Sequence, residues 1–435
     1  MTKKIYYLNT AFESVSEYNL ALLVQKYSIA FLFHSPTGQN IYAFDSISQL
    51  KPGEQNENQF TAVAKWQNYL FSKLEPLNAQ ILPQIVGSFS FTSGQQNSEI
   101  WESLTNGFFF LPKFLVIVEK KNFTLVTCSF TKNTIIQEST AFLRLLGTVD
   151  TKKKPYSNLI TKTEELAVTK WKDAVAETTK LIKETNLKKV VLARSLKVEF
   201  IHEFKVHTLW KKLKDTQPNT YRILLKQNTS LFISATPERL AKFSANQFET
   251  VALAGTIKRG DTLSEDAELG KKLITDPKNR GEQQFVVNTI SEILKKTGLI
   301  VNHPQNPILL KNKNVQHLYT PITGMGFYNL FSLLGELHPT PALGGLPKAD
   351  ALKQINKVEP FIRGLFGAPV GHISFDNSGE LAVGIRSGIL KANKAFLFAG
   401  AGIVAGSIPE NEVKETRMKF QPILQVLEGV SHSEK

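Results

Sequence analysis

Two glutamates and a lysine near the C-terminus are spaced so that they could hold a metal ion. Glu412, Glu415 and Lys419 fall on one side of a predicted helix, beside an apolar arc that includes Val413 and Phe420. Two carboxylates one turn apart, at the edge of a buried face, offer the oxygen ligands that Mg²⁺ prefers. The same spacing also occurs in exposed side chains that only stabilise a helix. This helix alone therefore leaves the metal site open.

A third glutamate, Glu282, favours the metal interpretation. It lies in a predicted helix that starts at the Asp276-Pro277 pair, an N-cap followed by proline, and that ends at Gly298. Its position one turn before Val286 predicts that it lies on the apolar stripe of that helix. A carboxylate on a core-facing stripe is costly unless it is paired or bound to a metal. Glu282 and the two C-terminal glutamates could therefore face one cavity that holds Mg²⁺.

Lys189 is a candidate general base. It opens a predicted strand over residues 189–200, in which the positions on its own face are apolar or small. Desolvation on a buried strand face disfavours the ammonium, and a neutral amine can accept a proton. A lysine at a strand end can instead extend its charge into water, as the adjacent Lys188 could.

A glycine-rich segment runs from Gly400 through Gly402 to Gly406, after a predicted strand. Its glycine spacing is one residue longer than that of the dinucleotide-binding fingerprint. The next helix starts with Glu410 and Glu412, whose charges would repel a pyrophosphate. We therefore expect no nucleotide here, although the glycines allow backbone N–H groups to approach a small anion.

The elements that must position these residues alternate between strands and helices. Short polar turns separate the predicted strands over residues 189–253 and 370–398, and such turns join antiparallel strands. A hairpin with a four-residue loop is predicted for residues 114–130, and a helix for residues 171–182. The sequence predicts an α+β fold with two large antiparallel sheets and helices packed outside them.

Two regions are expected along the chain. Residues 1–150 form a strand-rich N-terminal region and residues 160–430 a catalytic region, and we expect the two to be intertwined in one domain. The polar, lysine-rich stretch 147–158 is interpreted as the connection between them.

Composition excludes several classes of protein. Of 435 residues, 52 are Lys or Arg and 38 Asp or Glu, so the net charge is +14, but the basic residues are scattered. We therefore expect a diffuse basic surface and an anionic small-molecule substrate rather than nucleic acid. The single cysteine, Cys128, excludes a disulfide framework. The N-terminus lacks the apolar core of a signal peptide, and no apolar run reaches the about 20 residues of a membrane span, so we expect a cytoplasmic protein.

Nine segments occur in an order that resembles a known family. They are residues 189–194, 234–240, 252–256, 276–282, 315–318, 336–340, 382–387, 398–404 and 412–419. Together they are similar to the chorismate-utilising enzymes, which comprise the anthranilate, aminodeoxychorismate, isochorismate and salicylate synthases. The similarity covers about residues 165–430. The first third resembles the variable first part of isochorismate synthases more loosely.

This resemblance implies nucleophilic attack on the chorismate ring with loss of the 4-hydroxyl. It implies a Mg²⁺ ion held by Glu282 and Glu415, with Glu412 nearby, which agrees with the helix argument. Lys189 matches the base that activates water, and Glu238, presented by the turn at Pro237, matches the acid that protonates the departing hydroxyl. The implied substrate-binding residues are Gly255, Thr256, His317, His338, Arg386, Gly400, Gly402 and Lys419.

Two positions narrow the choice within the family. The ammonia-using branches usually carry glutamine where this chain has Lys189, and aminodeoxychorismate synthases have a nucleophilic lysine where it has Ala254. The resemblance therefore implies an isochorismate synthase, an isomerase that adds water at C2 and needs no glutaminase subunit. The first third of the chain resembles that of menaquinone-pathway enzymes and favours menaquinone biosynthesis, with a siderophore pathway as the alternative. Salicylate synthases, which go on to eliminate pyruvate, share nearly every motif and remain the alternative. The oligomeric state stays open.

Overall fold

The computed structural model describes residues 3–428 except 56, 148–157 and 312–314. Its strands pair into one hydrogen-bonded network that divides into two sheets sharing β6 (Phe108–Glu119). All strand pairs described are antiparallel apart from β1 with β4. The predicted α+β fold with two antiparallel sheets is confirmed.

The first sheet runs from the N-terminal region into the C-terminal half in the order β4-β1-β7-β6-β3-β2-β10-β11-β20-β21-β9, with β8 and β17 both beside β9. The bounds of its further strands are β1 (Ile5–Phe12), β2 (Ile29–His34), β3 (Asn40–Leu50), β4 (Leu74–Pro76), β7 (Asn122–Ser129), β8 (Ile160–Glu165), β9 (Lys189–Phe200), β10 (Tyr221–Gln227), β11 (Ser230–Thr236), β17 (Gly345–Leu346), β20 (Ser387–Lys391) and β21 (Lys394–Ile403).

The second sheet continues from β6 in the order β5-β18-β19-β12-β13-β16, with β14 and β15 beside β16. Its strands are β5 (Gln84–Ser88), β12 (Arg239–Ser244), β13 (Gln247–Lys258), β14 (Ile300–Asn302), β15 (Ile308–Lys311), β16 (Val315–Met325), β18 (Pro369–Ser374) and β19 (Gly379–Val383).

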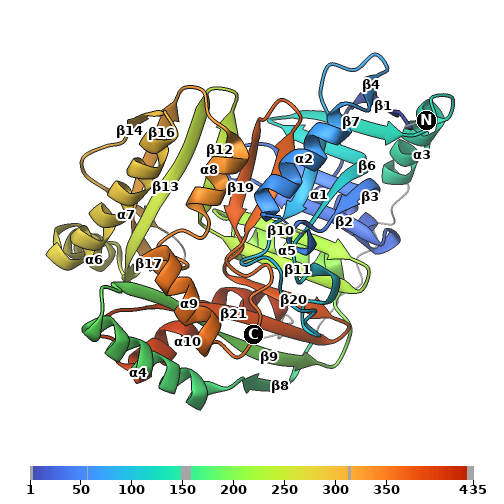
Figure 1. Cartoon of the computed structure of the whole chain (residues 1–435). Helices are drawn as coiled ribbons and strands as arrows, with labels where there is room; N and C mark the ends of the chain where they lie inside the picture. Colours follow the sequence, from blue (N-terminus) through green and yellow to red (C-terminus); the bar gives the residue numbers. More distant parts are fainter. Residues whose placement is uncertain (1–2, 56, 148–157, 312–314, 429–435) are drawn as a thin grey trace.

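Helices cover the outer faces of both sheets (Figure 1). At one end of the molecule α4 and α10 pack together against β9 and β21, whereas α6 and α7 lie beside β13 and β16. The α-helices are α1 (Glu17–Leu23), α2 (Gln59–Phe71), α3 (Ile135–Gly147), α4 (Val168–Glu184), α5 (Val206–Thr216), α6 (Leu263–Thr275), α7 (Pro277–Lys296), α8 (Leu330–Leu337), α9 (Lys348–Val358) and α10 (Pro409–Leu427). None of the helices in the described part of the chain is both long and apolar enough to span a bilayer.

Local sequence signals explain the elements that will matter for the site. Strand β9 has the predicted bounds, 189–200, because the residues through Leu196 are apolar or small apart from Lys189 and Arg194. Helix α7 starts where predicted, since the Asp276 side chain accepts a hydrogen bond from the N–H of Asn279 and Pro277 occupies the first turn. The predicted hairpin is confirmed as β6 and β7, but its loop is two residues long, because Glu119 pairs with Asn122.

The prediction that Glu282 lies on the buried face of α7 was wrong. The buried side of α7 is formed by Gln283, Val286, Val287 and Ile290, whereas Phe285 is about half exposed. The side chain of Glu282 is 43 % exposed, so it lies beside the buried face instead of on it. Helical spacing alone misplaced the apolar stripe of α7, because Phe285 and Val287, on either side of Val286, are both apolar.

The first third of the chain continues directly into the rest through strand pairing. β2 pairs with β10, and β5 pairs with β18. Most of the connection predicted between residues 147 and 158 lies outside the described residues.

Candidate active site

A cavity lies beside α10, and residues of both sheets form its wall. It opens between β9 and β21 on one side and β13 and β16 on the other, with the turn before β12 and the loop before β20 completing it. Its lining residues are Val191, Pro237, Glu238, Leu253, Ala254, Thr256, His317, Ala342, Leu343, Arg363, Phe366, Ile385, Arg386, Phe398, Ala399, Gly400 and Lys419. The charged groups among them are three cations and one acid, which suits an anionic ligand.

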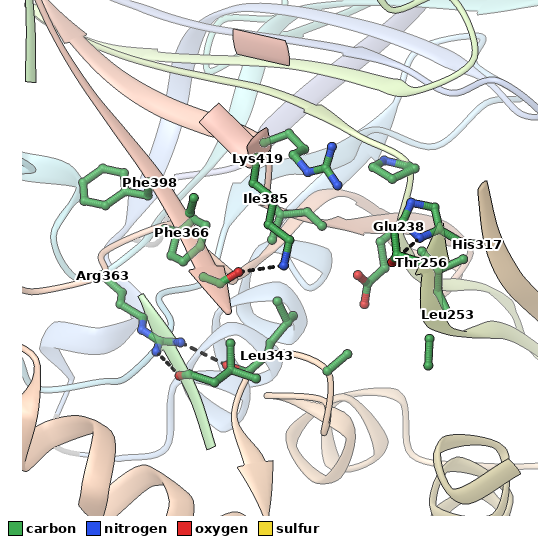
Figure 2. A pocket seen from close by; sticks show the side chains of 17 residues that line it. Glu238, Leu253, Thr256, His317, Leu343, Arg363, Phe366, Ile385, Phe398 and Lys419 are labelled. Atoms are coloured by element: carbon green, nitrogen blue, oxygen red, sulfur yellow. Dashed lines mark hydrogen bonds between the residues drawn. The ribbon is translucent and has the colours of Figure 1, made fainter. Parts of the chain in front are cut away.

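Glu238 is the acid in this cavity. Figure 2 shows its carboxylate and the ammonium of Lys419 directed into the same space. The side chain is presented by the turn between β11 and β12, whose Thr236 hydroxyl accepts the backbone N–H of Glu238. Burial raises the pKa of Glu238 to about 7, although the charges of Arg386, Lys189 and Lys419 oppose the shift. A carboxyl group held in this range can deliver a proton near neutral pH.

His317 contributes a neutral imidazole. Its Nδ1 lies 2.9 Å from the hydroxyl of Thr256, which follows an irregularity in the β13–β16 pairing at Gly255. Burial and the nearby charge of Arg386 lower the pKa of His317 to about 4, so the ring carries no charge at neutral pH. Its Nε2 is buried without a hydrogen-bond partner among the described residues, so it is available to a ligand in the cavity.

Arg386 and Lys419 supply the cationic side. Arg386 stands in the loop before β20 with a positive φ of 47°, a strained conformation for a side chain of this size. The charges of Glu238 and Glu415 act on it and oppose the lowering of its pKa by burial. Lys419, on α10, donates to the carbonyl oxygen of Gly400 at 2.8 Å and to Glu415 Oε1 at 2.6 Å. Two cations are therefore held at one side of the cavity.

Lys189 lies beside this cavity, at the start of β9. Its Nζ donates to Glu282 Oε1 at 2.7 Å, so in this state the amine is not free to accept a proton. The side chain is 18 % exposed and passes over Gly402, where a Cβ atom would lie 2.8 Å from Lys189 Cε. The absence of a side chain at Gly402 therefore gives Lys189 its path along the sheet.

The three candidate metal ligands fit a hard divalent cation in chemistry but are not gathered around one point. Glu412 and Glu415 stand at the edge of the buried face of α10, as predicted, and Glu282 stands on α7. Burial, together with the charge of Glu415, raises the pKa of Glu412, which a cation would reverse. Among the described residues no three acidic, histidine or cysteine side chains already form a metal cluster. The three carboxylates can bind one Mg²⁺ ion together only if their side chains move closer to one another.

Sequence comparison identifies the family. A family model described as "Chorismate binding enzyme" matches residues 3–428. The chain belongs to this family.

Relatives within the family are similar over most of the chain. An isochorismate synthase, MenF of Bacillus subtilis, is 34 % identical over 83 % of this chain and 78 % of its own length. The salicylate biosynthesis isochorismate synthase of Pseudomonas aeruginosa is 33 % identical over 60 % of this chain and 55 % of its own. The structure of MenF, the menaquinone-specific isochorismate synthase of Escherichia coli, shares the fold with a TM-score of 0.84 at 24 % identity, over 98 % of this chain and 95 % of that one.

The chorismate-binding fold brings together many but not all of the predicted site residues. Glu238, Thr256, His317, Arg386, Gly400 and Lys419 line the cavity. Gly402 lies under Lys189, and Gly255 adjoins Thr256. His338 lies outside the residues that line the cavity. It is buried against Phe60 and Phe91, and its Nε2 donates a hydrogen bond to the Phe91 carbonyl at 3.0 Å. Sequence could not separate the two histidines, because each stands in a family motif.

Two residues that carry part of the site were missed. Arg363 and Glu359, both 3 % exposed, form a buried ion pair one turn apart. Glu359 Oε1 accepts the N–H of Ala193 at 2.6 Å, and Arg363 donates to the carbonyls of Val191 and Leu343 at 2.6 and 3.0 Å (Figure 2). The pair thus completes the free edge of β9 beside β17, as a neighbouring strand would. The i,i+4 spacing of an acid and an arginine was the available signal.

The first third of the chain supports the cavity wall from behind. Trp101 stacks on the cavity residue Phe398 with ring centroids 5.1 Å apart, and its indole N–H donates to the carbonyl of Ile362. Phe91 packs against the Arg363 guanidinium at 4.2 Å. These contacts tie the N-terminal region to the residues that shape the cavity.

Proposed function

We propose that this protein is an isochorismate synthase, which converts chorismate to isochorismate by adding water at C2 with loss of the 4-hydroxyl. The observation that carries this proposal is the Glu238 carboxyl, whose pKa burial raises to about 7 within a cavity lined by Arg386 and Lys419. Such a group can protonate a poor leaving group near neutral pH. The cations suit the two carboxylates of chorismate.

The proton balance follows from two side chains. Lys189 takes a proton from water as the oxygen bonds to C2, the ring double bond shifts, and Glu238 gives a proton to the 4-hydroxyl, which leaves as water. One water enters and one leaves, so the net reaction is an isomerisation. Glu282 and Glu415, with Glu412, would hold Mg²⁺, which when bound neutralises the ring carboxylate and withdraws electron density from the ring. Lys189 must separate from Glu282 before it can act.

We propose water as the nucleophile because Lys189 stands where the ammonia-using branches usually carry glutamine, and because no amine lies at the position of the nucleophilic lysine of aminodeoxychorismate synthases. Ala254 lines the cavity there. We propose that no glutaminase subunit takes part and that the basic surface, with a net charge of +14, attracts the dianionic substrate and not nucleic acid. The likeness to the structure of MenF from Escherichia coli, a menaquinone-specific isochorismate synthase, supports a place in menaquinone biosynthesis.

The test is product analysis after incubation with chorismate and Mg²⁺ in the absence of an ammonia source. Isochorismate as the accumulating product supports the proposal. Salicylate with pyruvate would instead identify a salicylate synthase. Omission of Mg²⁺ and the Glu238→Gln variant serve as controls. The first should abolish the product, and the second should form it about 10²- to 10⁴-fold more slowly.

A further inference from the structure

Both lysines of the proposed reaction are held by glutamates assigned to the metal. Lys189 Nζ lies 2.7 Å from Glu282 Oε1, and Lys419 Nζ lies 2.6 Å from Glu415 Oε1. The first pair joins β9 to α7, and the second joins neighbouring turns of α10. Each of two carboxylates that a divalent cation would need as ligands is therefore paired with an ammonium group.

These contacts are supported by the surrounding structure. Gly402 leaves the space through which Lys189 reaches Glu282, and the Gly400 carbonyl anchors Lys419 at 2.8 Å. Both lysine side chains are partly buried, with 18 % and 32 % exposure, so their charges are incompletely screened by solvent. The two ammonium groups offset two negative charges, as one divalent cation would.

We propose that Lys189 and Lys419 act as internal counter-ions that occupy Glu282 and Glu415 until a divalent cation displaces them. The inference rests on the proposed function, since it assumes that these glutamates bind the metal. Cation and lysine compete for the same carboxylate oxygens, so each ammonium weakens metal binding in the absence of substrate. Displacement frees both lysines at the edge of the cavity, where the reaction needs them. Metal binding thereby changes the site. Before it, the lysines neutralise the glutamates, and after it the lysines are free to act on the substrate.

Removal of either lysine is predicted to raise the metal affinity of the substrate-free protein. Lys189→Met and Lys419→Met replace each ammonium with an apolar chain of similar length, and each should bind Mn²⁺ more tightly than the wild type. We expect the Kd to fall by about tenfold, the size of effect expected from one charge-assisted hydrogen bond. Binding is measured on the full chain without chorismate, from the electron paramagnetic resonance signal of free Mn²⁺, so the readout does not depend on turnover.

Matched variants separate local competition from overall charge. Lys188→Met and Lys414→Met remove the same charge from exposed neighbouring positions and should leave the Kd within about twofold of wild type. Lys189→Arg keeps a cation on Glu282 and should not tighten binding. Glu282→Gln and Glu415→Gln should weaken Mn²⁺ binding. Thermal unfolding curves verify that each variant is folded.

An unchanged or higher Kd in both lysine-to-methionine variants would overturn the inference, as would equal tightening in the Lys188→Met control. Unaltered Mn²⁺ binding in Glu282→Gln and Glu415→Gln would also overturn it, because these glutamates would then not be the ligands. The proposed function is judged separately by the product formed from chorismate. Tightened Mn²⁺ binding without isochorismate formation would support the counter-ion role and contradict the proposed function.

Discussion

At the Glu238 carboxyl, burial and charge act in opposite directions. Burial raises its pKa to about 7, whereas Arg386, Lys189 and Lys419 favour the ionised form. An acid must be protonated to act, so the protonated fraction of Glu238 declines as the pH rises above about 7. We predict that the ratio of the wild-type kcat to the kcat of a Glu238→Gln variant falls on this alkaline side, because both proteins share the ionisation of the base. The pH–rate profiles of both proteins at saturating Mg²⁺ and chorismate measure this ratio.

Glu238→Gln provides the control for this pH dependence. The amide cannot donate the proton, so kcat should drop by about 10²- to 10⁴-fold near neutral pH, and the profile of the variant should lack the ionisation of Glu238. A ratio of wild-type to Glu238→Gln kcat that stays constant between pH 6 and 8, or a Glu238→Gln variant with most of the wild-type kcat, would contradict the role of Glu238 as the acid.

Gly402 is predicted to control the position of the base. A methyl group there would lie 2.8 Å from Lys189 Cε and push this flexible side chain aside. Because a lysine can move at little cost, Gly402→Ala should leave thermal stability nearly unchanged but lower kcat by up to about a hundredfold. Gly406→Ala, with no atom within 4 Å of the added carbon, should keep wild-type kcat. Equal activity of the two variants would show that Gly402 does not position Lys189.

At the scale of elements, the buried Glu359–Arg363 pair is predicted to hold β9 in place. Removal of the Glu359 charge leaves the Arg363 guanidinium buried without its counter-ion. Glu359→Gln should therefore lower the free energy of unfolding by about 3 kcal/mol or more, measured by urea denaturation. It should also lower kcat, since β9 carries Lys189.

A surface pair on the adjoining helix α9 serves as the comparison. Asp350 and Lys353 are both mainly exposed, so Asp350→Asn should change the free energy of unfolding by less than about 0.5 kcal/mol. Equal stability of the Glu359→Gln protein and the wild type would contradict the structural role assigned to the buried pair.

Elements with local signals could be predicted from the sequence, whereas contacts between distant segments could not. Strand β9 and the start of α7 follow from apolar content and from the Asp276-Pro277 cap. The exposed position of Glu282 depends on which flank of α7 meets β13, and helical spacing does not specify this. The pairs Lys189–Glu282 and Arg363–Val191 join residues far apart in the chain, so no local pattern indicates them.

Over the whole molecule, we propose that the two predicted regions fold as one unit. The pairs β2–β10 and β5–β18 cross between them, and Trp101 stacks on Phe398 in the cavity wall. A fragment of residues 160–435 would expose both strand edges and lose this support. We predict that it shows no cooperative thermal unfolding by circular dichroism, in contrast to the full chain. Cooperative unfolding together with chorismate turnover by the fragment would contradict the proposal.

In the proposed reaction, this chain uses solvent water to convert chorismate into isochorismate. The most direct test is the wild-type reaction with chorismate and Mg²⁺ in ¹⁸O-labelled water, followed by mass spectrometry of the isolated product. We expect isochorismate with one heavy oxygen, located in the hydroxyl group at C2. Unlabelled isochorismate, or a different product, would contradict it.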